Sequence, residues 1–159
     1  MQLQLIRHAT LRLHYQGKIL LIDPLLGEKG TLPAIENVPI RDNNPLVDLP
    51  LPLTEITVCD AVLLTHTHRD HFDDQAAAAL AKDLPFLAQP EDKAALTERG
   101  FTNVIAVPRG SFLEWEGIRL LRTPAQHGHD DWAEQMAPAS GYLLQAPGEP
   151  TVYVMGDTV

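Results

Sequence analysis

Several features of exported, membrane-spanning and nucleic-acid-binding proteins are missing from the sequence. Cys59 is the only cysteine in 159 residues, so no intrachain disulfide can form, and a cytoplasmic location is expected. No apolar run reaches the ~18 residues of a membrane span, and the first residues lack the apolar core of a signal peptide. With 12 basic and 21 acidic residues, the overall field repels nucleic-acid backbones and anionic membrane surfaces. The charge and the missing apolar segments therefore argue against a nucleic-acid or membrane partner.

What the sequence does contain is the composition of a globular domain. Hydrophobic residues make up 45% and charged residues 21% of the chain, close to the protein average, and the length suits one hydrophobic core. We therefore predict a single domain over residues 1–159. An apolar strand expected at residues 152–155 would leave an edge that can pair with a second copy, so a homo-oligomer is kept open.

The pattern in the first third of the chain predicts short strands followed by a long loop. Apolar and polar residues alternate at residues 3–5 and 11–13, and a Gln16-Gly17-Lys18 turn leads into the apolar run 19–22. Prolines then interrupt residues 24–52, which we interpret as an ordered loop able to wall a site.

The rest of the chain alternates strands with helices and then continues as strands. Helices are predicted at residues 75–82, capped by Asp73 or Asp74, and at residues 91–99, closed by Gly100. The remaining strands are expected at residues 61–64, 85–88, 104–107, 112–115, 118–123, 141–144 and 152–155. The pattern is that of a mixed α/β fold, with sheet layers flanked by helices.

Metal-ligand side chains are concentrated directly after the strand at residues 61–64. His66, His68, Asp70 and His71 lie within six residues, where α/β folds commonly build their sites. Neutral imidazole suits zinc and related metals, and a carboxylate also accepts harder ions such as manganese. The alternative is a solvated turn whose histidines bind nothing, but four ligands so closely spaced favour a metal site.

The segment His66-Thr67-His68-Arg69-Asp70-His71 matches the His-x-His-x-Asp-His signature, and the chain resembles the metallo-β-lactamase superfamily. Ile22-Asp23-Pro24, Arg7-His8-Ala9 and Gly156-Asp157-Thr158 look like the branch containing L-ascorbate-6-phosphate lactonase and many metal-dependent hydrolases. Arg7 departs from the glycine usually found before that histidine. The resemblance implies a four-layer αββα sandwich, whose C-terminal half we expect to be truncated in this chain.

The family pattern implies two divalent metal ions, Zn or Mn, held by six residues. His66, His68 and His127 would bind one ion, Asp70 and His71 the second, and Asp157 would bridge them. His129 is the competitor of His127. The superfamily carries a further histidine at the second site, and no histidine follows His129 in this chain.

Two other residues near these motifs have two interpretations each. His8 either lies near the site or is a core histidine whose ring nitrogens are hydrogen-bonded. Asp23 either orients a metal ligand through a hydrogen bond, without binding the metal itself, or is the first residue of an Asp-Pro turn.

The activity implied is metal-dependent hydrolysis, with a hydroxide shared by the two ions and Asp70 as the catalytic residue that orients it. Esters, lactones and phosphodiesters are the expected substrates.

Because one ligand of the second site is missing, a non-catalytic metal-binding or partner-binding remnant is the alternative. The intact motif disfavours a redox di-iron centre, and the missing signal peptide disfavours a β-lactamase proper. Trp132 and Met136 either line the substrate pocket or only pack.

Overall fold

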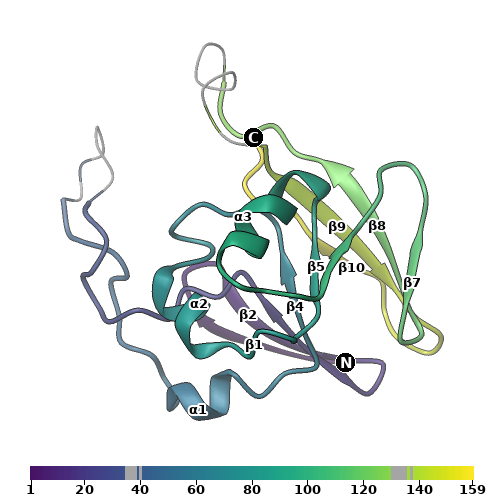
Figure 1. The fold of residues 1–159 in the computed structure, drawn as a ribbon, viewed down its shortest axis with the longest axis horizontal. Helices are drawn as coiled ribbons and strands as arrows, with labels where there is room; N and C mark the ends of the chain where they lie inside the picture. The colour runs from purple at the N-terminus through teal and green to yellow at the C-terminus, as the bar shows by residue number, and fades with distance from the viewer. Residues whose placement is uncertain (35–38, 40, 130–135, 137) are drawn as a thin grey trace.

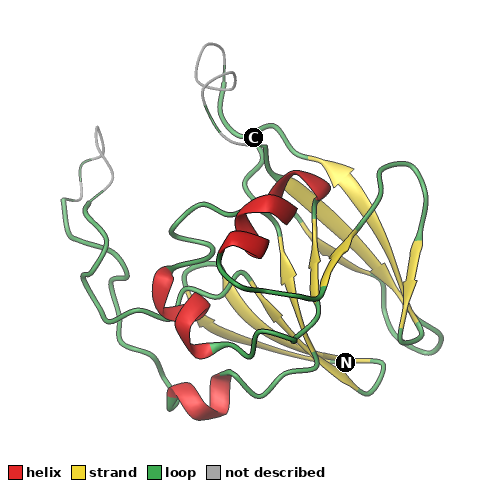
Figure 2. Ribbon diagram, viewed as in Figure 1, coloured by secondary structure: helices red, strands yellow, loops and turns green. Residues whose placement is uncertain are grey.

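Two β-sheets packed face to face, with helices on the outer face of the larger sheet, make up the computed structural model (Figures 1 and 2). The structure describes residues 1–34, 39, 41–129, 136 and 138–159. The alternation of strands and helices along the chain therefore forms the mixed α/β architecture predicted from the sequence.

The larger sheet combines an antiparallel meander with a parallel half. β1 (Gln2–Arg7), β2 (Thr10–Tyr15) and β3 (Lys18–Ile22) pair antiparallel in chain order. β4 (Ala61–Leu64), β5 (Phe86–Ala88) and β6 (Val104–Ala106) then continue the sheet in parallel from β3. All residues of β4 and β5 are buried, as expected for parallel strands covered on both faces. The parallel strands end at one edge of the sheet, where the metal-ligand segment begins.

Three short helices cover the outer face of this sheet. They are α1 (Leu53–Ile56), α2 (Asp74–Ala79) and α3 (Lys93–Glu98), the last preceded by the 3-10 turn η1 (Pro90–Asp92). Phe72, Phe86 and Phe101 stack between helices and sheet, with ring centroids 4.3 to 5.8 Å apart. Among the described helices, none has both the length and the apolar character needed to cross a bilayer.

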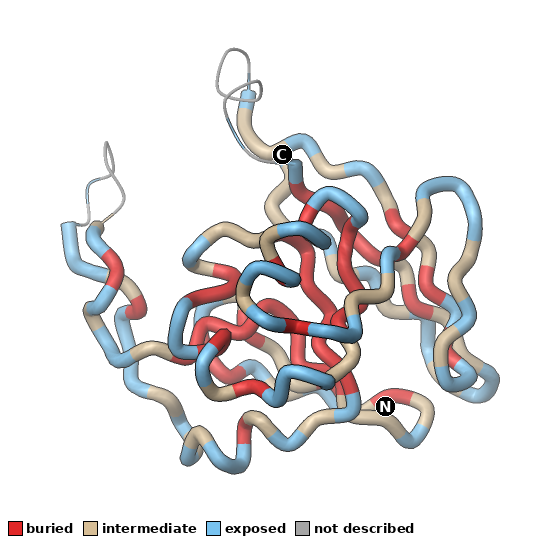
Figure 3. The backbone as a smooth tube through the Cα atoms, viewed as in Figure 1, coloured by how far each residue is buried: buried red, intermediate tan, exposed pale blue. Residues whose placement is uncertain are grey.

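The smaller sheet is antiparallel throughout and packs on the inner face of the larger one. It contains β7 (Leu113–Trp115), β8 (Ile118–Pro124), β9 (Ser140–Gln145) and β10 (Val152–Val154), in the order β10-β9-β8-β7. The side chains that fill the space between the sheets are fully buried, and Figure 3 shows this buried layer in the strands of both sheets. They include Leu13, Leu20, Leu63, Leu87, Ile118, Leu120, Tyr142 and Leu144.

The outer face of the smaller sheet carries no helix within the described part of the chain. Leu121 and Leu143 pair across strands on this face and are half-buried, and Tyr153 beside them is 49% exposed. The described residues thus supply one helical layer and two sheets of the expected four-layer sandwich.

The helices differ from the prediction in three places. α1 was not predicted, and it is only four residues long. α2 ends at Ala79, because Leu80 turns to extended backbone and enters the core at 3% exposure. The helix expected at residues 91–99 is divided into η1 and α3. In the described part of residues 24–52 the pairing is limited to one isolated bridge, between Leu32 and Asn44, as predicted for a loop.

Asp73 is the N-cap of α2 and also fixes the loop that follows β3. Its Oδ1 accepts a hydrogen bond from the Ala76 backbone N–H at 2.7 Å. Its Oδ2 accepts from the N–H groups of Leu26 at 3.1 Å and Gly27 at 2.6 Å. This buried carboxylate therefore satisfies three backbone donors at once.

We expect Asp73→Ala to lower the free energy of unfolding by ~2 to 4 kcal/mol, because it removes a helix cap and leaves buried N–H groups unpaired. Urea unfolding would measure the change. Asp74→Ala is the matched control, since Asp74 is 84% exposed and its ion pair with Arg99 lies at the surface. Equal effects of the two substitutions would contradict the role given to Asp73.

Candidate metal centre

The 66–71 loop folds back at the C-terminal end of β4 and gathers three imidazoles. The His68 carbonyl accepts hydrogen bonds from the N–H groups of His71 at 2.9 Å and Phe72 at 2.8 Å. This turn brings the ring of His66 to 4.6 Å from that of His68 and 4.2 Å from that of His71, between centroids. The short spacing in the sequence therefore becomes a cluster in space.

His127 and Asp157 join the cluster from the smaller sheet. His127 follows β8, with its ring centroid 4.8 Å from that of His68. Asp157 follows β10, and its carboxylate lies between the other groups, with Oδ1 3.2 Å from His71 Nε2 and Oδ2 3.4 Å from His127 Nε2. Gly156 permits this approach, because it has φ of +65° and an added Cβ would lie 2.6 Å from the Ser140 carbonyl oxygen.

All six residues expected at the site lie in one region. Three groups have ligand atoms within 4.8 Å of one another: His66 with His68 and His127, His66 with His71 and Asp157, and His8 with Asp70 and His71. His129 is exposed and belongs to none of these groups among the described residues. The geometry therefore favours His127 over its competitor, and it places His8 at the site.

An unpaired buried nitrogen indicates that the cluster fits a metal ion. His66 is 0% exposed, and its Nδ1 lies 3.0 Å from Thr65 Oγ1. Its Nε2 faces the cluster and makes no hydrogen bond within the described chain. A buried polar atom without a partner costs free energy, and a divalent cation held by His66 and its neighbours would remove that cost.

Electrostatics keep two of these imidazoles in the neutral form that binds metals. Burial, followed by the nearby positive charge of His71, lowers the pKa of His66 to about 3. Burial, followed by the charge of His127, also lowers the pKa of His68. Both side chains are therefore available as ligands at neutral pH without first losing a proton.

His71 behaves in the opposite way because two carboxylates hold it. Burial disfavours its charged form, but hydrogen bonds to Asp157 and Asp23 outweigh this and raise its pKa to about 10. Asp23 Oδ2 lies 2.9 Å from His71 Nδ1, and the same carboxylate accepts hydrogen bonds from the Thr65 N–H and hydroxyl. Asp23 thus orients His71 so that Nε2 faces the cluster, as the ligand-orienting interpretation predicted.

A buried polar network, which local sequence patterns do not predict, supports the 66–71 loop from the side of η1 and the smaller sheet. Thr67 donates to Asp92 Oδ1 at 3.0 Å, and Gln89 donates to Asp92 Oδ2 at 2.9 Å. Gln89 in turn accepts hydrogen bonds from Arg122 and Ser140 of the smaller sheet. The only signal in the sequence was a polar residue, Gln89, directly after a buried strand.

The cluster opens into a cleft of about 370 Å³. Part of its wall comes from the long loop, through Leu32, Pro33 and Asn44, in line with the expectation that this loop borders a site. Met136 also lines the cleft, whereas Trp132 lies outside the described residues. The other lining residues are His8, His68, Arg69, Asp70, His127 and Asp157.

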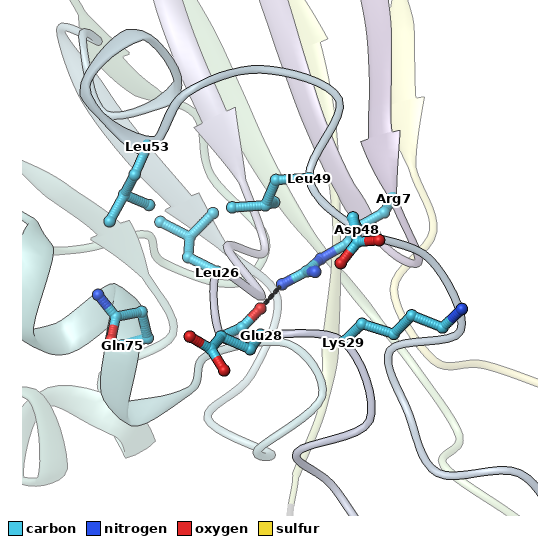
Figure 4. A pocket seen from close by; sticks show the side chains of 9 residues that line it. Arg7, Leu26, Glu28, Lys29, Asp48, Leu49, Leu53 and Gln75 are labelled. Atoms are coloured by element: carbon cyan, nitrogen blue, oxygen red, sulfur yellow. Dashed lines mark hydrogen bonds between the residues drawn. The ribbon is translucent and has the colours of Figure 1, made fainter.

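A second cavity, of about 510 Å³, lies around Arg7 on the helical side of the long loop (Figure 4). It contains none of the clustered histidines. Because the candidate metal ligands line the cleft of about 370 Å³ and not this cavity, that cleft is the candidate site.

Comparisons with known proteins agree with this architecture. A family model described as "Beta-lactamase superfamily domain" matches residues 18–159. The UPF0173 protein YddR of Bacillus subtilis is 38% identical over 163 residues, covering 100% of this chain and 63% of that protein. The structure of a possible metal-dependent hydrolase from Veillonella parvula has a TM-score of 0.92 at 38% identity, covering 100% of this chain and 63% of that one. The structure of an isothiocyanate hydrolase from Delia radicum gut bacteria has a TM-score of 0.90 at 36% identity, covering 100% and 64%.

The chain therefore belongs to the beta-lactamase superfamily and has the metallo-β-lactamase fold. Within it, several relatives are described as UPF0173 metal-dependent hydrolases, so the class at the level of the family is metal-dependent hydrolase. The chain spans less than two thirds of the length of these relatives.

In the metal-free chain, His71 and His66 should contribute to stability with opposite pH dependence. The pKa of His71 is raised from 6.5 to about 10, so its contribution is complete below pH 6.5 and is lost as the pH rises toward 10. The pKa of His66 is lowered from 6.5 to about 3, so its contribution is complete above pH 6.5 and is lost as the pH falls toward 3.

Urea unfolding of chelator-treated protein from about pH 5 to about pH 9 would measure these contributions. We expect the difference in stability between wild type and His71→Gln to shrink on the alkaline side. The corresponding difference for His66→Gln should shrink on the acid side. Two differences with the same pH slope would contradict the charge states assigned to the cluster.

Proposed function

We propose that this chain forms the metal-binding part of a hydrolase that takes up two divalent ions, Zn or Mn, and acts on a small ester, lactone or phosphodiester. The observation that carries the proposal is the buried Nε2 of His66, which has no hydrogen-bond partner among the described residues and lies among ligand atoms from segments of both sheets. Membership of a superfamily with metal-dependent hydrolases supports it. The single cysteine supports the further proposal that the protein works in the cytoplasm.

Two sets of side chains divide the binding of the ions. His66, His68 and His127 would hold one ion through nitrogen alone, and Asp70 with His71 would hold the other, with Asp157 between them. When bound, such ions supply Lewis acidity and lower the pKa of water toward neutrality. No serine or cysteine nucleophile is needed for hydrolysis at such a site.

Asp70 is the proposed catalytic residue. Burial raises its pKa, but the hydrogen bond with His8 and the charge of His71 outweigh burial, so its pKa lies below the usual range. Its carboxylate is therefore ionised at neutral pH and can accept a hydrogen bond from the attacking water. The side chain lines the cleft, so it can orient water toward a substrate bound there.

The cleft walls suit a small substrate with an apolar part and an anionic or polarised part. Leu32 and Pro33 offer apolar contact, and Arg69 brings a positive charge to the same cleft. The relative described as an isothiocyanate hydrolase favours a second candidate substrate class, the isothiocyanates. Esters, lactones and isothiocyanates share an electrophilic carbon that water can attack.

Metal uptake is the first test of the proposal. We expect close to two Zn²⁺ ions per chain after chelation and reloading, measured by elemental analysis and by calorimetric titration. His66→Ala should abolish the tighter step, because it removes the buried ligand of the all-imidazole set. His14→Ala, which removes a histidine of β2 outside the three ligand groups, should leave both steps unchanged. Uptake of less than one ion by wild type would rule the proposal out.

Turnover is the second test. With Mn²⁺ or Zn²⁺ at saturation, Asp70→Ala should lower kcat by about 10² to 10³ and change KM little, because orienting the nucleophile acts mainly on the transition state. Asp74→Ala removes an exposed carboxylate of α2 and serves as the control. Absence of metal-dependent turnover on a panel of esters, lactones, phosphodiesters and isothiocyanates would favour the non-catalytic remnant.

A further inference from the structure

His8 lies outside the ligand set that the family pattern assigns, yet it stands with two members of that set. Its Nε2 is 3.3 Å from Asp70 Oδ2, and His71 Nε2 is 3.8 Å from the same oxygen. The rings of His8 and His71 are 6.0 Å apart between centroids. The three ligand atoms therefore surround one space, beside the all-imidazole group of His66, His68 and His127.

The backbone around His8 is arranged to present its side chain at this place. β1 and β2 pair with a register shift between Leu5 and Arg7, and His8 occupies the tight connection with φ of +49°. A left-handed conformation costs free energy for any residue with a Cβ and is cheap for glycine. In this conformation the His8 side chain lies next to Asp70 and His71.

Buried contacts on both sides of His8 hold the connection in place. The Arg7 guanidinium donates to the carbonyl oxygens of Leu25, Gly27 and Val47, and Figure 4 shows it reaching from β1 to the long loop beside Asp48. On the other side, the Thr10 hydroxyl donates to the Asp23 carbonyl oxygen at 2.7 Å and accepts from the Leu25 N–H at 2.8 Å. The position of the His8 backbone is thus fixed by buried hydrogen bonds rather than by the exposed turn alone.

The chemistry of the three side chains suits a divalent cation. Two imidazoles and one carboxylate form a common three-ligand set for zinc and related metals, with a further position left open to solvent or substrate. His71 Nδ1 is hydrogen-bonded to Asp23, so Nε2 is the nitrogen of His71 that is available to a cation in this space. Asp70 is half-buried beside the cleft, so one side of the set remains open.

We propose that His8 is a direct ligand of the second metal ion, together with Asp70 and His71. The inference rests on the proposed function, since it assumes that the chain takes up a second ion. It adds the β1–β2 connection to the segments that supply ligands to that site. Apart from Asp157, which would lie between the ions, the first site is purely imidazole, whereas the second contains a carboxylate of its own and accepts harder ions.

A bond from His8 to the metal must be distinguished from a hydrogen bond to Asp70, because loss of an outer partner also weakens metal binding by about 10- to 100-fold. Cadmium is the probe: ¹¹³Cd is titrated into the chain labelled with ¹⁵N-histidine, and couplings between metal and nitrogen are recorded. Such a coupling requires a direct bond. We expect the ion bound in the second step to couple to the imidazoles of both His8 and His71.

Variants of His8 test the same point by affinity. His8→Ala should weaken the second step by about 100-fold or more, remove one coupling from its signal and leave the first step unchanged. His8→Asp should recover part of the affinity, because a carboxylate can replace imidazole as a ligand. His14→Ala is the matched control, and thermal melting of each variant checks that the fold is retained.

The outcomes separate this inference from the proposed function. If wild type binds two Cd²⁺ ions and the second couples only to His71, His8 is not a ligand and the two-metal proposal survives. Unchanged binding of the second ion by His8→Ala would lead to the same conclusion. If wild type binds a single Cd²⁺ ion, the two-metal proposal and the inference fail together.

Discussion

The buried carboxylate of Asp23 is the contact on which the rest of the centre depends. It stands at the end of β3 and accepts hydrogen bonds from the backbone and hydroxyl of Thr65, at the end of β4. The same group holds His71 Nδ1, and the Asp23 carbonyl oxygen accepts from Thr10, next to the β1–β2 connection. One residue therefore links the ends of β3 and β4 with the β1–β2 connection, and it fixes the direction in which His71 points. Burial of a carboxylate without partners costs a large free energy, and these hydrogen bonds offset that cost for Asp23.

The second constraint connects the two sheets. Arg122 in β8 is 4% exposed and donates to Ser140 and to Gln89, and Gln89 in turn contacts Asp92, which holds Thr67. Thr67 lies between two histidines of the loop, so this network determines where the smaller sheet stands relative to the ligands of the larger one. His127 and Asp157 both come from the smaller sheet. The distances of His127 and Asp157 to His66 and His71 therefore depend on polar contacts that no local sequence pattern predicts.

The sequence predicted the elements that local patterns specify and missed those that tertiary contacts decide. The Asp73 cap and the strands followed from hydrophobic periodicity and capping rules, and the cluster of His66, His68 and His71 followed from close spacing. The helix expected at residues 91–99 is divided because Asp92 turns inward to Thr67 and Gln89. His127 and Asp157 could be named only through the family resemblance, since their spacing carries little information. The place of His8 stayed open because it depends on a positive φ and on contacts of Arg7 with a loop distant in sequence.

The ligand atoms come from the β1–β2 connection, the loop after β4, the end of β8 and the segment after β10. These segments are far apart along the chain, and each enclosed stretch must be ordered before the ligands can meet, at an entropic cost that grows with its length. The 66–71 loop supplies two members of each ligand group, but no local stretch contains all three members of any group. A complete group is therefore assembled only when these distant segments have met, so an ion held by all members of a group would indicate that the segments are in their final arrangement.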